Sequence, residues 1–428
     1  MKQFFELEKH GTSVKVEVMA GITTFLTMAY ILIVNPLTLA EAGMDFGAVF
    51  TATTLSALIA TLIMALVAKL PFALAPGMGL NAFFAFSVCI GMGKSWSFAL
   101  TAVFLEGIIF VILTLLNIRE AIINCIPQNI KKAISVGIGL FVAFIGLKNG
   151  GIIAPNDATY LQLGEMNPAT ILAIGGLIIT SIMLAKKIKG ALLWGILVTT
   201  VIGIPIGVTN MEGFTLFKAP PSLSPIFLKF EWSQILTLDM AIVLFTFLFV
   251  DMFDTVGTLI GVCTNCGMIN EKGEIPRAKQ ALLADAIGTT VGAILGTSTV
   301  TTYVESTSGV SEGGRTGLTS LTTAGMFFLA LFLSPLFLMV PNAATAPALI
   351  LVGLFMINPI KEIEWKNITE AVPAFLTIIM MPLTFSISQG IVFGILSFVI
   401  LKLATGKGKD ISPLTYVISI LFLLNFFI

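Results

Sequence analysis

Five carboxylate side chains interrupt strongly apolar stretches of this sequence, and they are its best candidates for chemistry. A charged side chain near the middle of a bilayer costs about 2.5–3.5 kcal/mol, so such residues usually face a polar cavity and serve a function. Two of the five are three residues apart and would be neighbours on one helical face. The five residues are Glu106, Asp251, Asp254, Asp285 and Glu305.

The composition predicts that these carboxylates lie in a polytopic membrane protein. The chain has 428 residues, of which 57% are hydrophobic and 11% charged, and its mean hydropathy is +1.02. A soluble domain has about 25% charged residues. The net charge of zero argues against a nucleic-acid partner. Cys263 and Cys266 have the spacing of a metal or redox pair, but a lone pair without a nearby histidine favours a structural role, so we expect no metal and no cofactor.

Two apolar segments are interrupted where a simple membrane helix would not be. The first contains Pro76-Gly77-Met78-Gly79-Leu80-Asn81, and the residue before a proline avoids the helical conformation. The second begins with the β-branched run 299–304 and continues as Glu305-Ser306-Thr307-Ser308-Gly309. Broken segments at matching positions of two halves indicate a transporter's binding site. We therefore predict short extended strands within the third and tenth spans.

The apolar segments predict an all-α polytopic membrane protein with about fourteen spans. Spans three and ten correspond if the chain consists of two inverted seven-span repeats. With a cytoplasmic N-terminus this count places 19 of the 23 Lys and Arg residues inside, which agrees with the positive-inside rule. We expect a multi-pass protein of the cell membrane. Whether residues 411–428 cross the bilayer or lie in its interface is left open.

The residue types around the two interruptions suggest separate roles in binding and coupling. Unpaired N–H groups at the start of a half-helix would favour the anion of Glu305. Glycines let a ligand approach the backbone closely, and Asn81 offers donors and acceptors. Burial disfavours a charged carboxyl, so Asp254 is the predicted proton-coupling residue and Asp251 the alternative. The predicted substrate-binding residues are Glu305, Asp254, Asn81, Gly79, Gly77, Thr307 and Ser306. Glu106 and Asp285 fit a structural role equally well.

Three motifs give the chain a more specific resemblance. They are Gly77–Asn81, Val250–Gly257 and Thr301–Gly309, and together they resemble the azaguanine-type purine permeases of the nucleobase/ascorbate transporter superfamily over nearly the whole chain. The resemblance implies purine uptake with protons, and a homodimer through the gate domain is a further expectation. It also implies a core domain of residues 15–119 and 237–340, a gate domain of residues 130–236 and 341–404, and a C-terminal segment of residues 405–428. Some uracil-type relatives carry a histidine where this chain has Thr258.

Other classes of function remain as alternatives. A purine is flat and neutral, and a carboxylate can accept two of its parallel N–H groups in strong charge-assisted bonds. An anion transporter of the sulfate-permease type would share the architecture, but Glu305 would repel an anion. A channel would need a filter of charged rings or carbonyls, which the sequence does not show. An enzyme is disfavoured because no nucleophile–base pair is present and the single histidine, His10, lies outside the spans.

Overall fold

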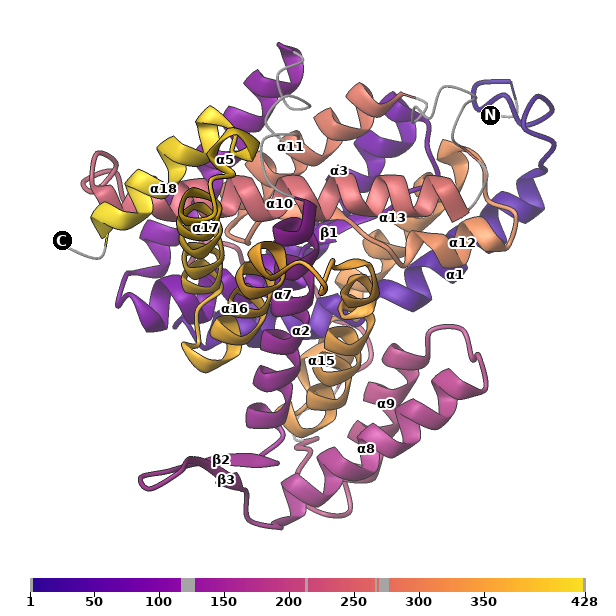
Figure 1. The fold of residues 1–428 in the computed structure, drawn as a ribbon. Helices are drawn as coiled ribbons and strands as arrows, with labels where there is room; N and C mark the ends of the chain where they lie inside the picture. The colour runs from indigo at the N-terminus through magenta and orange to yellow at the C-terminus, as the bar shows by residue number, and fades with distance from the viewer. Residues whose placement is uncertain (1–2, 117–127, 212–214, 266–267, 269–276, 426–428) are drawn as a thin grey trace.

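The computed structural model describes residues 3–116, 128–211, 215–265, 268 and 277–425. Arg119, Cys125, Cys266 and residues 270–276 of a predicted charged turn lie outside the described residues. Helices dominate the described chain, and β1 lies near the middle of the molecule with helices around it (Figure 1).

The helices follow the predicted apolar segments, and several begin at a side chain that accepts a hydrogen bond from the first turn. The first half contains α1 (Val14–Met28), α2 (Ile31–Ala40), α3 (Phe46–Ile63), α4 (Met78–Ala82), α5 (Trp96–Leu115), α7 (Gln128–Asn149), α8 (Pro168–Ala185) and α9 (Ala191–Gly203). The second half contains α10 (Leu238–Asn265), α11 (Ala278–Leu295), α12 (Ser306–Ser311), α13 (Gly317–Phe332), α14 (Ser334–Leu338), α15 (Asn342–Met356), α16 (Ile368–Leu383), α17 (Ile387–Ala404) and α18 (Pro413–Asn425). The capping residues include Ser13, Asp45, Ser95, Asn167, Asn367 and Ser386.

Wider and tighter helical turns extend some of these elements. Two π-helical stretches follow α3 and α4, at Met64–Ala68 and Phe83–Gly91. Short 3₁₀ turns lie at Asn358–Glu362 and Gly408–Asp410. Because π-helical turns occur frequently at functional sites, the stretch Phe83–Gly91 indicates that the segment containing α4 belongs to such a site.

The two predicted interruptions are short strands, and this prediction is confirmed. Strand β1 (Leu74–Pro76) pairs antiparallel with β4 (Val300–Thr302), with Ala75 opposite Thr301. Non-helical backbone inside a membrane must satisfy its hydrogen bonds within the protein. The pairing does this, because each broken segment supplies the partner that the other one lacks.

A second small sheet lies in the polar stretch 148–167, where the sequence predicts no strand. Strands β2 (Ile153–Asn156) and β3 (Tyr160–Leu163) form an antiparallel hairpin there. The Asn156 side chain accepts hydrogen bonds from the backbone N–H groups of Ala158 and Thr159, at 2.9 and 3.0 Å, and so stabilises the turn. The hairpin lies at one end of the molecule, far from β1 (Figure 1).

Among the described residues, six continuous helical stretches are long and apolar enough to cross a membrane alone. Other apolar helices, such as Met78–Gly91 and Gly317–Phe332, are shorter. This establishes a helical membrane-type fold, while the count of fourteen spans stays a prediction. The six stretches are Val14–Ala40, Phe46–Ala68, Trp96–Leu115, Asn129–Asn149, Pro168–Ala185 and Asn342–Glu362.

The helices pack in two main groups. Helix α13 packs against α1 and α3, and α11 packs against α3 and α5, around the paired strands. Helix α7 packs against α15 and α16, α16 against α17, and α8 against α9 and α15. The proposed division into core and gate domains, with its residue boundaries, stays a prediction.

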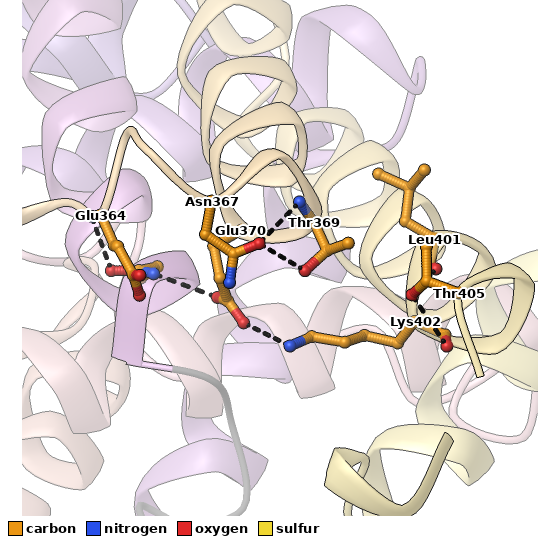
Figure 2. A network of polar contacts seen from close by, with 8 residues as sticks. Glu364, Asn367, Thr369, Glu370, Leu401, Lys402 and Thr405 are labelled. Atoms are coloured by element: carbon orange, nitrogen blue, oxygen red, sulfur yellow. Dashed lines mark hydrogen bonds and ion pairs between the residues drawn. The ribbon is translucent and has the colours of Figure 1, made fainter. Parts of the chain in front are cut away.

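A buried ion pair joins three helices of the second group (Figure 2). Lys402 of α17 lies 2.8 Å from Glu370 of α16, and their side chains are only 7% and 14% exposed. The amide nitrogen of Asn129, on α7, donates to the same carboxylate at 3.0 Å. Removing one partner from such a pair costs about 3–5 kcal/mol, so this contact holds α7, α16 and α17 in one arrangement.

Candidate functional site

The pairing of β1 with β4 brings the two broken segments together. Beyond the strands, Gly77 N–H donates to Thr299 O and Tyr303 N–H donates to Ala73 O, both at 3.0 Å. Helices α4 and α12 therefore start from opposite ends of one two-stranded ribbon. Every predicted substrate-binding residue on these two segments lies within a few residues of the ribbon.

Glu305 lies at the start of α12, where the strand gives way to the helix, and its side chain is half-buried. Its carboxylate does not cap the helix: within α12, all of whose residues the structure describes, it forms no capping hydrogen bond. Instead Oε1 accepts a hydrogen bond of 2.7 Å from the hydroxyl of Tyr30. The hydrogen-bond donor to the Glu305 carboxylate is thus a phenol from the break between α1 and α2, and not the first turn of α12 as expected.

Asp254, on α10, lies beside the start of the other half-helix. A Cβ added to Gly77 would be 3.6 Å from Asp254 Oδ2, and it would collide with the methyl group of Thr301. Asp254 also interacts electrostatically with Glu305 and Asp285. Gly77 therefore makes room for Thr301, and the carboxylate of Asp254 lies within van der Waals range of the same point.

The other predicted binding residues are placed differently from one another. The side chain of Asn81 is 1% exposed; its Oδ1 accepts a hydrogen bond from Ser298, and its Nδ2 lies 3.4 Å from Pro76 O. The hydroxyl of Ser306 is fully buried and accepts from Ala73 N–H at 3.0 Å, so it joins the two segments. Thr307 is half-buried.

Gly79 contacts another helix rather than the carboxylates. A Cβ at this position would lie 2.6 Å from Cγ2 of Ile138, on α7. The glycine therefore allows α4 to lie close against α7. Its predicted role in binding substrate stays a prediction, and the structure adds a packing role.

One threonine hydroxyl joins two buried carboxyl groups. Thr255 Oγ1 lies 2.8 Å from Asp285 Oδ1, 3.2 Å from Asp251 Oδ1 and 2.8 Å from Thr301 Oγ1, and the three partners are at most 1% exposed. A hydroxyl has one proton to donate and two lone pairs. The hydroxyl of Thr255 therefore joins Asp251 on α10, Asp285 on α11 and Thr301 on β4.

Two further buried contacts surround the ribbon. The hydroxyl of Thr299 donates to Glu106 Oε2 at 2.6 Å, so Glu106 binds the segment just before β4. The amide nitrogen of Asn35, on α2, lies 2.7 Å from Thr53 Oγ1 and 2.8 Å from Thr297 Oγ1. These contacts fix the position of the ribbon against α2, α3 and α5.

Two tyrosines, Tyr30 and Tyr303, belong to the site but were not among the predicted site residues. Tyr30 is 1% exposed and Tyr303 5%, and the hydroxyl of Tyr303 donates to Pro76 O at 2.5 Å. The chain has only four tyrosines, and a buried tyrosine hydroxyl normally needs a partner. A tyrosine in the middle of an apolar span was therefore a usable signal for a polar neighbour at the same depth.

A surface groove lies away from this site. It has a volume of about 510 Å³, and its walls are apolar side chains of α3 and α13, among them Leu62, Leu321 and Phe328. None of the carboxylates of the site lines it. An apolar groove of this kind suits acyl chains of the bilayer rather than a polar solute.

Comparison with known proteins identifies the family. The model of a group described as "Permease family" matches residues 15–393. The chain belongs to this permease family. The permease is 44% identical over 426 residues to the adenine permease AdeP of Escherichia coli, covering 99% of this chain and 95% of that protein. It is 46% identical over 439 residues to the guanine/hypoxanthine permease PbuG of Bacillus subtilis, covering 100% and 99%.

Solved structures support the same fold. The permease resembles the transmembrane domain of a cyanobacterium bicarbonate transporter, BicA, with a TM-score of 0.63, 16% identity, and coverage of 91% of this chain and 96% of that one. At this identity the likeness concerns the fold alone. The resemblance to the nucleobase/ascorbate transporter superfamily is confirmed, and the permease is a multi-pass membrane transporter rather than an enzyme.

Proposed function

We propose that this permease is a secondary active transporter that takes up purine nucleobases by proton symport. Guanine, hypoxanthine and adenine are the candidate substrates, because the full-length relatives AdeP and PbuG are permeases for adenine and for guanine and hypoxanthine. The observation that carries the proposal is the half-buried carboxylate of Glu305 at the strand ribbon, with Asp254 beside the opposite half-helix.

The chemistry of this arrangement suits a flat, neutral heterocycle. Glu305 can accept N–H groups of a purine edge, and hydrogen bonds to a charged acceptor are about twice as strong as neutral ones. Asp254 lies beside Gly77, at the start of the opposite half-helix. We propose Glu305, Asp254, Asn81, Gly79, Gly77, Thr307 and Ser306 as the substrate contacts.

Asp254 is the proposed coupling residue, and Asp251 is the alternative. Asp254 interacts electrostatically with two other carboxyl groups, Asp285 and Glu305, so proton binding there would relieve repulsion among three acids. Release of the proton would restore that repulsion and favour movement of the core against the gate. The proposal includes a cytoplasmic N-terminus, as the distribution of Lys and Arg indicates, and a homodimer through the gate domain.

An anion transporter is the rival function, because the structural neighbours BicA and SLC26A9 share the fold. The carboxylates of the site argue against it. A negatively charged substrate between Glu305 and Asp254 would meet two like charges without a described Lys or Arg bonded to either carboxylate. The fold is thus common to both functions, and the site favours a neutral substrate.

Uptake by intact cells tests the proposal. The permease is produced in cells that lack their own purine permeases, and uptake of labelled guanine, hypoxanthine and adenine is measured with and without a protonophore. We expect saturable uptake that the protonophore abolishes, with uracil, sulfate and bicarbonate as poor competitors. Stronger competition by sulfate or bicarbonate than by any purine would overturn the substrate class, and accumulation that persists with the protonophore would overturn proton coupling.

A further inference from the structure

A buried phenol from outside both broken segments contacts the carboxylate of the site. Helix α1 ends at Met28 and α2 begins at Ile31, and Tyr30 lies at the break between them. Its side chain is 1% exposed, and its hydroxyl lies 2.7 Å from Glu305 Oε1, 275 positions later in the sequence. A phenol and a carboxylate from distant parts of the chain thus form a hydrogen bond at the proposed binding site.

This contact limits what Glu305 can do with its two oxygens. An ionised carboxylate only accepts hydrogen bonds, and because the hydroxyl of Tyr30 donates to Oε1, Oε2 is the oxygen with more accepting capacity left. Glu305 makes no capping hydrogen bond to the first turn of α12. The phenol therefore fixes the rotation of the carboxylate about its last bond.

We infer that Tyr30 is a positioning residue that sets the selectivity of the site among purines. The inference rests on the proposed purine transport and adds a residue that determines which purine edge is preferred. Because one lone pair of Oε1 already accepts from Tyr30, Oε1 is a weaker acceptor for a substrate N–H than Oε2. Hypoxanthine offers one such N–H on its six-membered ring, whereas guanine offers a parallel pair, N1–H and the 2-amino group, which needs both oxygens.

Removing only the hydroxyl therefore has a directional effect. In Tyr30→Phe both oxygens of Glu305 become available, so binding of guanine should improve relative to hypoxanthine. Hypoxanthine itself should bind about twofold to tenfold more weakly, because the carboxylate loses the hydrogen bond that orients it. A substitution that only destabilised the fold would weaken the binding of both purines equally.

Tyr303→Phe provides the matched control. Its hydroxyl is also buried in the site, but it donates to Pro76 O rather than to Glu305. Tyr303 and Asp254 interact electrostatically with the phenol of Tyr30, so they are the other groups through which a change at position 30 could act. Tyr303→Phe should leave the guanine-to-hypoxanthine ratio unchanged even if it weakens both.

The experiment measures equilibrium binding of labelled hypoxanthine and guanine to the purified full-length protein. It uses the wild type, Tyr30→Phe, Tyr303→Phe, Glu305→Gln and the double variant Tyr30→Phe/Glu305→Gln. We expect the ratio to shift several-fold in Tyr30→Phe alone. We also expect Tyr30→Phe to have little further effect on hypoxanthine binding once Glu305 is Gln, since residues that act through one another are not additive.

The outcomes separate this inference from the proposed function. A wild-type protein that binds no purine overturns the proposed function and this inference with it. Purine binding with an unchanged ratio in Tyr30→Phe, or with effects of Tyr30→Phe and Glu305→Gln that add, overturns the inference alone. If Tyr30→Phe is unstable, 4-fluorophenylalanine at position 30 is used instead, because it keeps the size of the side chain but cannot donate a hydrogen bond to Glu305. An unchanged ratio in that protein again overturns the inference.

Discussion

Glu305 is charged, held in one orientation by Tyr30 and partly exposed. The substitution Glu305→Gln, which replaces one carboxylate oxygen by an amide nitrogen, tests its role in binding. In Glu305→Gln the amide oxygen can still accept from Tyr30, which turns the NH₂ group toward substrate N–H groups. A hydrogen bond to a charged acceptor is worth about 1.5–3 kcal/mol, so purine affinity should fall roughly tenfold to a hundredfold. Binding of labelled hypoxanthine to purified protein measures this. Wild-type affinity in Glu305→Gln contradicts its role as a substrate ligand.

Asp254 should affect coupling more than binding. Asp254→Asn mimics the protonated acid and removes one of three neighbouring negative charges. We expect the variant to bind purine but to lose accumulation against a gradient, and its binding should lose most of its pH dependence near neutral pH. Uptake into proteoliposomes under an imposed pH gradient, compared with binding in detergent, separates the two effects. Uphill accumulation at the wild-type level would show that the coupling proton lies elsewhere, with Asp251 as the next candidate.

The strand ribbon is the element whose geometry the site depends on, and Gly77 is its tightest point. The backbone of Gly77 (φ −73°, ψ 130°) suits any residue, so the requirement for glycine is steric. In Gly77→Ala the new methyl group meets the methyl of Thr301, and overpacking of this kind costs about 1–3 kcal/mol. We expect weaker purine binding and a lower melting temperature in detergent.

Two further variants show whether the collision is the cause. Gly325→Ala places a methyl group in open space on α13 and should leave both quantities near the wild-type values. Thr301→Ser removes the methyl group but keeps the hydroxyl that contacts Thr255, so Gly77→Ala/Thr301→Ser should recover most of the loss. Without recovery in the double variant, the explanation by this contact is wrong.

Glu231 lies near the end of the segment between α9 and α10, and its carboxylate holds this segment to the start of α5. Hydrogen bonds from Ser95 and then Gln234 lower the pKa of Glu231 below its ordinary value of 4.5. A lowered pKa means that the contribution to stability is complete above the ordinary value and is lost as the pH falls through the folded-state value. Acidification to pH values below this ordinary value should therefore release this segment from the start of α5.

Trp232, next to Glu231, can report this release. Its ring lies 6.0 Å from that of Phe104 and 5.6 Å from that of Phe230, so its fluorescence senses the packing of the segment. With the other three tryptophans replaced by phenylalanine, the emission should change on acid titration, and Glu231→Gln should show no such transition. The same titration curve in Glu231→Gln would assign the transition to another group.

At the scale of the whole molecule, the sequence predicted the features that depend on neighbouring residues. Pro76 and the β-branched run before Glu305 specify the two breaks locally, and the family motifs lie around them. Most apolar segments became helices near their predicted bounds. The hairpin at residues 153–163 was missed because its turn depends on one side chain, Asn156, within an otherwise polar stretch.

Contacts between distant residues account for most of what could not be predicted. Tyr30 and Glu305 are 275 positions apart, and Thr255 and Thr301 are 46 apart. The helical spacing of apolar residues indicates which face of a helix a residue lies on. It does not indicate which other helix packs against that face. The role of Thr255 as the bridge between Asp251 and Asp285 therefore became visible only when α10, α11 and β4 were seen together.

Alternating access requires the core to move against the gate, and one ion pair spans the proposed boundary. Lys189, in the turn between α8 and α9, lies 2.5 Å from Glu312, at the end of α12. Helix α12 begins at Glu305, so movement of the binding residue carries Glu312 with it. This exposed pair adds only about 0–1 kcal/mol, which lets it break and form during a transport cycle.

A covalent link at this pair should stop transport without abolishing binding. In a background without native cysteines, Lys189→Cys/Glu312→Cys is joined by a reducible bifunctional thiol reagent that matches the span. We expect uptake to fall to background, purine binding to persist, and uptake to return after reduction, because the link prevents the core from moving while leaving Glu305 in place. The control pair is Lys132 and Glu362, which lie 3.3 Å apart on the same side of the proposed boundary, so linking them should leave transport intact. Full uptake by the linked 189–312 protein would mean that α12 and the α8–α9 turn do not separate during transport, and the boundary between core and gate would have to be drawn elsewhere.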